Sequence, residues 1–236
     1  MSTLTAVRPT PVASPDLLAP LGEVLVRSAR VGAGETVLDV AAGTSSAGAA
    51  ATVRGARVAS WRVDRQETAP FADRSFDVAV AGPGAVLAPD HRRTVDEMVR
   101  VTRSGGRLAL LGWTPQGFMG QVLTSVQPFL PAGLADGASP ALWGDADHVL
   151  ALLGDRVDRV VRARPALLVD RFATPRELRE HLRHEHEPTA AAYRTVADQP
   201  SRVTALDRLL ADLARDHMSW GGLLEWDYLL LTARRS

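Results

Sequence analysis

Two hydrophobic patterns alternate along this chain: short apolar or β-branched runs, and longer segments in which apolar residues recur every three or four positions. The short runs are typical of buried strands, and the longer segments are typical of helices that pack one face on a core. The predicted strands lie at residues 36–40, 56–61, 78–81, 107–112 and 223–233. Strands that alternate with helices predict an α/β fold with a doubly wound, mostly parallel sheet. We expect all 236 residues to form one domain.

Helices are predicted between these strands by their caps and their periodicity. Ser14, Pro15 and Asp16 supply a hydroxyl cap, a proline for the first turn and an acid that faces the helix dipole, so a helix is expected from here to Gly32. Further helices are expected at 47–54, 90–103 and 145–153, with three more from about 175 to 218. Residues 1–13 are expected to form a loose tail and 157–172 to be extended, while a loop-rich segment at 115–144 and the helices at 175–218 cover the site.

The strand at 36–40 leads into a turn rich in small residues, and this turn opens a helix. The N-terminus of a helix carries unpaired N–H groups and positive partial charge, so such a turn can receive a polar or anionic group. Asp39 is interpreted as a structural acid that accepts hydrogen bonds from the turn. Ligands bind beyond the carboxyl ends of strands in sheets of this kind. The candidate ligand contacts at those ends are Gly43, Thr44, Ser45, Gly82, Pro83, Gly84 and Trp113.

Composition narrows the function classes. Arginine supplies all 27 basic residues and balances 27 acidic ones, which argues against nucleic-acid binding because that normally needs a basic face. Without cysteine there is no thiol nucleophile and no thiolate metal site, and without lysine there is no Schiff-base chemistry. No apolar run reaches about 18 residues and no signal-peptide pattern opens the chain, so we expect a cytoplasmic protein that does not enter a membrane.

Three motifs resemble those of the class I S-adenosylmethionine-dependent methyltransferases. Residues 37–45 (Val-Leu-Asp-Val-Ala-Ala-Gly-Thr-Ser) look like the first motif of that family. Residues 70–77 look like the segment before its fourth strand, and 100–108 like the Arg-Pro-Gly-Gly turn before its fifth. Residues 139–148 and the final strand look like a small-molecule branch. The resemblance covers nearly the whole chain and implies the family's Rossmann-like fold.

The sequence departs from the family pattern at the methyl-donor site. The three glycine places of the first motif fall on Ala41, Gly43 and Ser45, so a serine side chain stands where backbone passes close to the ligand. The acid that binds the ribose hydroxyls in the family falls on Arg62, which has no acceptor. A slipped register lets Asp64 take that role; the alternatives are a solvated acid or a partner for an arginine.

The connection after Arg62 is also short, because only seven residues separate it from Pro70. A helix of about three turns and a further strand do not fit into that length. Hydrogen bonds to a charged group are worth roughly 1.5–3 kcal/mol each, so losing two ribose contacts weakens binding by about two to four orders of magnitude. The prediction is that this chain has no cofactor, or binds S-adenosylmethionine through Asp64.

Two further groups of residues are candidates for chemistry. Asp90 and His91 follow the fourth-strand loop and form either an oriented general base or a helix cap followed by a surface histidine. Trp113 and Trp143 are candidates to line a pocket for a flat or cationic molecule, with core packing as the alternative. His181 and His184 share a helix face that Pro188 is expected to end; a solvated face is preferred there to a metal site.

Three functions are consistent with these features. The first is a methyltransferase-like enzyme of specialised metabolism that has abandoned its cofactor and promotes a cyclisation, elimination or isomerisation of a small molecule, with Asp64, Asp90 and His91 as catalytic residues. The second is a working small-molecule methyltransferase. The third is a non-catalytic subunit that forms a homo- or heterodimer with a methyltransferase-like paralogue, because the shortened sheet exposes an edge strand near 57–63.

Overall fold

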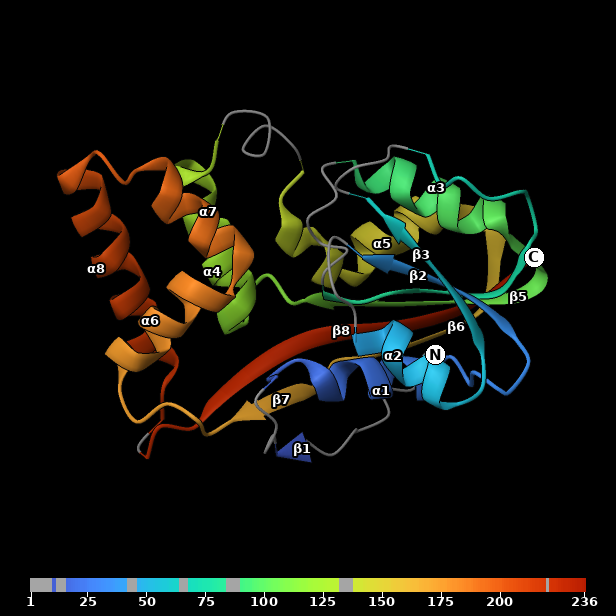
Figure 1. Cartoon of the computed structure of the whole chain (residues 1–236), viewed down its shortest axis with the longest axis horizontal. Helices are drawn as coiled ribbons and strands as arrows, with labels where there is room; N and C mark the ends of the chain where they lie inside the picture. Colours follow the sequence, from blue (N-terminus) through green and yellow to red (C-terminus); the bar gives the residue numbers. More distant parts are fainter. Residues whose placement is uncertain are drawn as a thin grey trace.

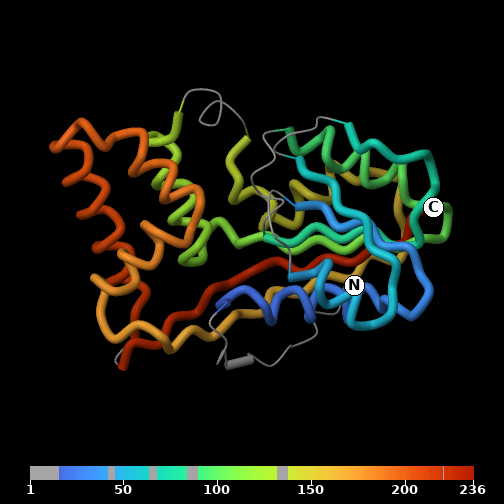
Figure 2. The backbone as a smooth tube through the Cα atoms, viewed as in Figure 1, coloured from blue at the N-terminus to red at the C-terminus, as the bar shows by residue number. Residues whose placement is uncertain are grey.

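A mixed eight-stranded sheet is the centre of the fold in the computed structural model, which describes residues 10–11, 16–41, 46–63, 68–83, 90–131, 138–219 and 221–236. The strands are β1 (Thr10–Pro11), β2 (Thr36–Ala41), β3 (Arg57–Arg62), β4 (Phe76–Ala81), β5 (Thr102–Trp113), β6 (Val157–Ala163), β7 (Ala166–Val169) and β8 (Leu224–Arg235). Their order is β1-β7-β8-β5-β4-β2-β3, and β6 also pairs with β8. Strands β3, β2, β4 and β5 are parallel, whereas β8 runs back along β5 (Figure 2). The predicted α/β architecture is confirmed.

Helices cover both faces of the sheet and one of its ends (Figure 1). The helices are α1 (Ala19–Ser28), α2 (Ser46–Val53), α3 (His91–Val101), α4 (Phe118–Val126), α5 (Ala146–Leu153), α6 (Pro175–Glu185), α7 (Glu187–Thr195) and α8 (Pro200–His217). α1 and α2 pack together on one face, and α3 and α5 on the other. α4 joins α6, α7 and α8 beyond the end of the sheet. None of the helices in the described part of the chain is both long and apolar enough to cross a membrane.

Burial explains why β2 and β4 form the middle of the parallel sheet. Val37, Leu38 and Val40 of β2 are fully buried, as are Val78 and Val80 of β4. Side chains on both faces of a parallel strand are covered by helices, so a continuous apolar run is stable there. The polar exception in β2 is Asp39, which is 2% exposed.

Several predicted boundaries need correction. The segment 115–144 contains α4, whose apolar residues pack against α7 and α8, and is therefore less loop-rich than expected. α1 begins at Ala19 rather than at Ser14, which lies outside the described residues. Pro188 does not end a helix: α6 ends at Glu185, and Pro188 occupies the first turn of α7, where its missing N–H costs no hydrogen bond.

Along the described part of the chain no further strand occurs between β3 and β4, as the short connection predicted. In the described part of the chain β3 is the edge strand, and β4 follows it directly in sequence. Residues 68–75 instead form a strap across α3. The three helices expected between 175 and 218 are present as α6, α7 and α8.

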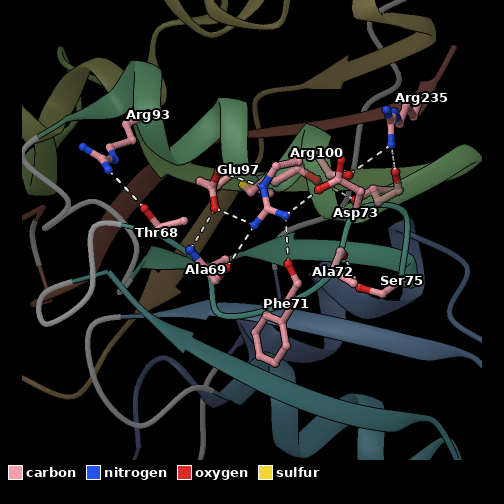
Figure 3. A network of polar contacts seen from close by, with 12 residues as sticks. Thr68, Ala69, Phe71, Ala72, Asp73, Ser75, Arg93, Glu97, Arg100 and Arg235 are labelled. Carbon is pink, nitrogen blue, oxygen red and sulfur yellow. Dashed lines mark hydrogen bonds and ion pairs between the residues drawn. The ribbon is translucent and has the colours of Figure 1, made fainter.

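Arg100 of α3 holds this strap in place (Figure 3). Its guanidinium donates to the carbonyl oxygens of Ala69 and Phe71 at 2.9 and 2.8 Å and to Asp73 Oδ1 at 2.7 Å. Two further bonds, at 2.8 and 2.9 Å, reach the carboxylate of Glu97, which also accepts from the Ala69 N–H at 2.8 Å. These contacts replace the packing that a helix and strand provide in a longer connection.

Candidate functional site

The carboxyl ends of the parallel strands meet next to β2. From β2 the chain passes to β3 on one side, while β4 lies on the other side, so the direction of winding reverses at β2. Ligands in open α/β sheets bind outside the carboxyl ends of the strands at such a switch point. Only residues 42–45 separate β2 from α2, so the N-terminus of α2 lies at this position.

Asp39 is buried in β2 and packs closely against α2. A Cβ atom added to Gly48 would lie 2.5 Å from Asp39 Oδ2, so only glycine leaves room for the carboxylate. Asp39 is therefore a buried acid beside α2, and its predicted hydrogen bonds to the turn stay a prediction. Gly43, Thr44 and Ser45, the predicted contacts in the turn, lie outside the described residues.

The strand next to the switch point ends in a base rather than an acid. Arg62 is the last residue of β3 and pairs in register with Ala41, the last residue of β2. Its guanidinium can donate to a ribose hydroxyl but cannot accept from one. The predicted substitute, Asp64, lies outside the described residues, as does Gly84. Gly82 is buried at the carboxyl end of β4 and Pro83 half-buried.

Asp90 and His91 begin α3, and their side chains have different roles. Asp90 is exposed and caps the helix, because its Oδ1 accepts from the Arg93 N–H at 2.9 Å. The surface position considered for His91 is wrong, since the residue is only 3% exposed. Its Nδ1 lies 3.1 Å from His148 Nε2 of α5, and its ring centre lies 4.7 Å from that of Trp143. The structure therefore joins His91 and Trp143 with His148.

Trp143 is fixed at the carboxyl end of β5 by two glycines. A Cβ atom on Gly112 would lie 2.4 Å from the Trp143 carbonyl carbon, and one on Gly144 would lie 1.8 Å from the Trp113 carbonyl oxygen. The 3₁₀ helix Pro140–Gly144 can therefore lie directly on β5. This contact brings the His91 cluster to the carboxyl end of β5, the edge at which open α/β sheets generally bind ligands.

Burial keeps the His91 imidazole neutral. The pKa of His91 is lowered to about 4, mainly by the loss of hydration and further by His148, while Asp90 opposes the shift. His91 Nε2 and Trp143 Nε1 are buried and have no hydrogen-bond partner in the part of the chain that the structure describes. Unpartnered buried nitrogens are costly, so they mark a position where a ligand group would be stabilised.

This pKa predicts that acid weakens the fold. The unfolded chain binds a proton on His91 near pH 6.5, whereas the folded chain binds it only near pH 4, so stability falls as the pH decreases between these values. The loss is up to about 3 kcal/mol, since each pKa unit is worth about 1.4 kcal/mol. We expect His91→Gln to lose correspondingly less stability in urea unfolding between pH 6.5 and 4. His186, whose pKa burial also lowers to about 4, remains in both proteins as an internal reference. Equal pH dependence of the two proteins would contradict the prediction.

Trp113 lies in an aromatic cluster. Its indole is 2% exposed and makes edge contacts with Trp226 and Tyr228, with ring centres 6.0 and 6.3 Å apart. Phe118 of α4 stacks on Trp226. The cluster joins β5 and β8 to the helices beyond the sheet, and contact of Trp113 with a ligand stays a prediction.

The histidines of α6 are separated from this site. His181 packs on Phe172, with ring centres 5.0 Å apart, and His184 is exposed near Glu180. No cluster of three potential metal-binding side chains occurs within the described ranges.

Sequence reasoning missed His148 and Asp227. His148 is 57 residues from His91 and follows the Asp145 cap of α5, so no local pattern indicates that they meet. Asp227 of β8 lies beside Gly117, before α4, where burial raises the pKa of its carboxyl group and Glu225 adds to the effect. Glu225 and Asp227 alternate with Trp226 and Tyr228 along β8, so alternation could have marked that side of the strand as polar.

Comparisons with known proteins agree with this geometry. Residues 21–110 match the family model described as a methyltransferase domain. The chain is 35% identical over 243 residues to uncharacterized protein Rv1403c of Mycobacterium tuberculosis, covering 93% of this chain and 88% of that protein. Demethylmenaquinone methyltransferase of Mycobacterium sp. (strain KMS) is 37% identical over 101 residues, which cover 34% of this chain and 42% of that enzyme.

Solved structures show the same fold at low sequence identity. YcgJ from Bacillus subtilis aligns with a TM-score of 0.53 and 16% identity, covering 91% of this chain and 98% of that one. Protein BH2331 from Bacillus halodurans aligns with a TM-score of 0.53 and 17% identity, covering 94% and 99% of the two chains. At this identity the likeness concerns the fold alone.

Proposed function

This chain belongs to the family of class I S-adenosylmethionine-dependent methyltransferases, and on that premise we propose that it methylates a small molecule. The observation that carries the proposal is the switch point at β2, which lies between β3 and β4 in the sheet and is followed in the chain by α2. The helices α4 and α6–α8 beyond this end favour an enclosed small substrate over a macromolecule. The partial relative named as a demethylmenaquinone methyltransferase also supports a small substrate.

The described residues near the N-terminus of α2 fit a methyl donor better than the residue at the end of β3 does. The buried Asp39 and the close approach of Gly48 support a tight turn at the N-terminus of α2, where polar groups bind well. Arg62 at the end of β3 does not supply an acceptor for ribose hydroxyls, so the proposal assigns that role to Asp64. S-adenosylmethionine, when bound, supplies the methyl group.

The His91–His148 pair is proposed to handle the proton that a hydroxyl or amine substrate loses. His91 Nδ1 lies 3.1 Å from His148 Nε2, and His148 is half-buried, so the pair leads from a buried position toward solvent. Trp143 orients the His91 ring from one side. If the role is correct, the His91→Gln variant will lose kcat by about two orders of magnitude, a typical effect of removing acid–base catalysis, with little change in methyl-donor affinity.

Titration calorimetry with S-adenosylhomocysteine tests the proposal. We expect micromolar binding by the wild type, and a loss of about tenfold to a hundredfold in Asp64→Asn, because one or two hydrogen bonds to a charged acceptor weaken. The matched control is Asp158→Asn, since Asp158 is exposed on β6, at the opposite edge of the sheet. Binding that Asp64→Asn leaves unchanged would refute the assigned ribose acid but not the methyltransferase.

A cofactor-independent reaction is a second candidate, favoured by Arg62 at the ribose position and by the missing strand between β3 and β4. It predicts no calorimetric signal with S-adenosylhomocysteine, together with turnover of a small molecule in the absence of any methyl donor. The third candidate, a non-catalytic subunit, is motivated by the edge position of β3. It predicts an inactive chain that co-purifies with an active paralogue, and a stable active monomer would exclude it.

A further inference from the structure

A groove lined by arginines lies near the amino ends of β4 and β5, away from the switch point. It encloses about 530 Å³ and is bounded by the end of α1, the first half of β5, and the paired strands β6 and β8. Its arginines are Arg27, Arg30, Arg107, Arg159 and Arg234. No acidic residue is among the described residues that line it. In a chain with no net charge, this concentration of positive charge is a local feature.

Within the described residues, an ion pair neutralises only one of these five arginines. Arg107 pairs with Glu35 and donates to the Arg30 carbonyl oxygen at 2.9 Å. The other four arginines make no ion pair with any residue in the described ranges. Several positively charged side chains around a concave surface raise the local electrostatic potential and attract anions. The groove therefore has the electrostatics of an anion site.

Unsatisfied and strained groups occur in the same groove. The Nε atom of Arg234 is buried and has no hydrogen-bond partner in the described structure, which costs free energy unless an acceptor arrives. Arg30 and Arg159 have positive φ angles of 53° and 48°, and only one other described non-glycine residue, Arg74, shares this conformation. Such backbone costs energy for residues with a side chain and is concentrated at functional sites.

The floor of the groove is apolar. It is formed by Ala29, Val161, Ala163, Leu230 and Ala233. Val161 is 56% exposed, so the groove offers an accessible aliphatic surface. A ligand that fills this space therefore needs an apolar part as well as negative charge.

We propose that this groove binds a phosphate group joined to an apolar chain. A phosphate monoester carries up to two negative charges and three acceptor oxygens, which several guanidinium groups can share, whereas a carboxylate offers one charge and two oxygens. The volume is in the range of small-molecule sites, about 300–1,000 Å³. The same chemistry is present in a soluble alkyl phosphate and in the headgroup of an anionic lipid.

Titration calorimetry with hexyl phosphate tests the site in the full-length protein. The variant Arg159→Gln/Arg234→Gln removes two groove charges, and Arg57→Gln/Arg208→Gln removes two exposed charges outside the groove. We expect the groove variant to bind about 100-fold more weakly, at roughly tenfold per lost charge-assisted bond, and the control variant to bind like the wild type. No binding by the wild type, or equal binding by all three proteins, would overturn the proposal, unless the vesicle assay below shows groove-dependent binding.

Two further measurements identify the source of the phosphate and guard against misfolding. Co-sedimentation with phosphatidylcholine vesicles, with and without phosphatidic acid, tests whether the phosphate belongs to a lipid headgroup. Vesicle binding that requires both phosphatidic acid and the groove arginines supports the proposal with a lipid as the ligand. Val161→Ser leaves every charge in place and changes an exposed side chain, so it should weaken hexyl phosphate binding but not inorganic phosphate binding. If Val161→Ser affects neither probe, the apolar half of the proposal is wrong.

Discussion

Replacing Arg100 with methionine is expected to lower the free energy of unfolding by about 3–4 kcal/mol, because it breaks a partly buried ion pair and leaves neighbouring acceptors without donors. The guanidinium is 29% exposed and Glu97 13% exposed, so water compensates only in part. The strap at 68–75 loses at once the three hydrogen bonds that Arg100 donates to Ala69, Phe71 and Asp73. Urea unfolding at pH 7 measures the change.

Arg194→Met is the matched control for this experiment. Arg194 pairs with Glu187 on the surface, where both side chains are more than 60% exposed, and such pairs contribute only about 0–1 kcal/mol. If Arg100→Met costs no more than the control, the strap is held by its backbone and not by Arg100.

The Arg100 contacts also make the fold sensitive to acid. The hydrogen bonds from Arg100 hold the pKa of Glu97 below its ordinary value of 4.5, and the Ala69 N–H adds to the effect. A carboxyl group whose pKa is lowered in the folded state stabilises it above the unfolded pKa, and this contribution is lost as the pH falls through the folded value. Arg100→Met should therefore flatten the decline in stability below pH 4.5 relative to the wild type, which carries the same His91.

Replacing Gly144 with alanine is expected to cost more than about 3 kcal/mol, at the upper end of the overpacking range, because backbone atoms cannot yield as a flexible side chain would. The added Cβ would lie 1.8 Å from the Trp113 carbonyl oxygen and 2.5 Å from the Thr114 nitrogen. The 3₁₀ helix must then move away from β5 and take Trp143 with it. We expect both a lower urea midpoint and a change in tryptophan fluorescence, since Trp143 leaves its contact with His91.

Gly32→Ala separates this clash from the general effect of removing a glycine. A Cβ atom on Gly32 has only the Glu35 Oε2 atom within 4 Å, at 3.7 Å, which is an ordinary contact. Because alanine has fewer conformations than glycine in the unfolded chain, the Gly32→Ala variant is expected to be more stable than the wild type by roughly 0.4–1 kcal/mol. If Gly144→Ala is as stable as Gly32→Ala, the helix at 140–144 adjusts easily and does not fix Trp143.

Much of the fold follows from local patterns that need no knowledge of distant contacts. The apolar run of β2 and the amphipathic period of α3 were sufficient to place both elements, because burial acts on each segment with its own periodicity. The short connection between Arg62 and Pro70 was sufficient to predict that no further strand follows β3, since it has too few residues for a helix and a strand. Element boundaries were less accurate, as at α1 and α4, because capping and packing decide them residue by residue.

The sequence by itself determined the order of strands and helices along the chain and the position of Arg62 at the end of a strand. Only the tertiary structure decided which side chains meet. His91 contacts His148, which lies 57 residues further along the chain, and the groove arginines lie in or next to α1, β5, β6 and β8. The physical reason is that hydrophobic periodicity is local, whereas the charges and hydrogen bonds of a site depend on groups from distant segments that meet only when the chain folds.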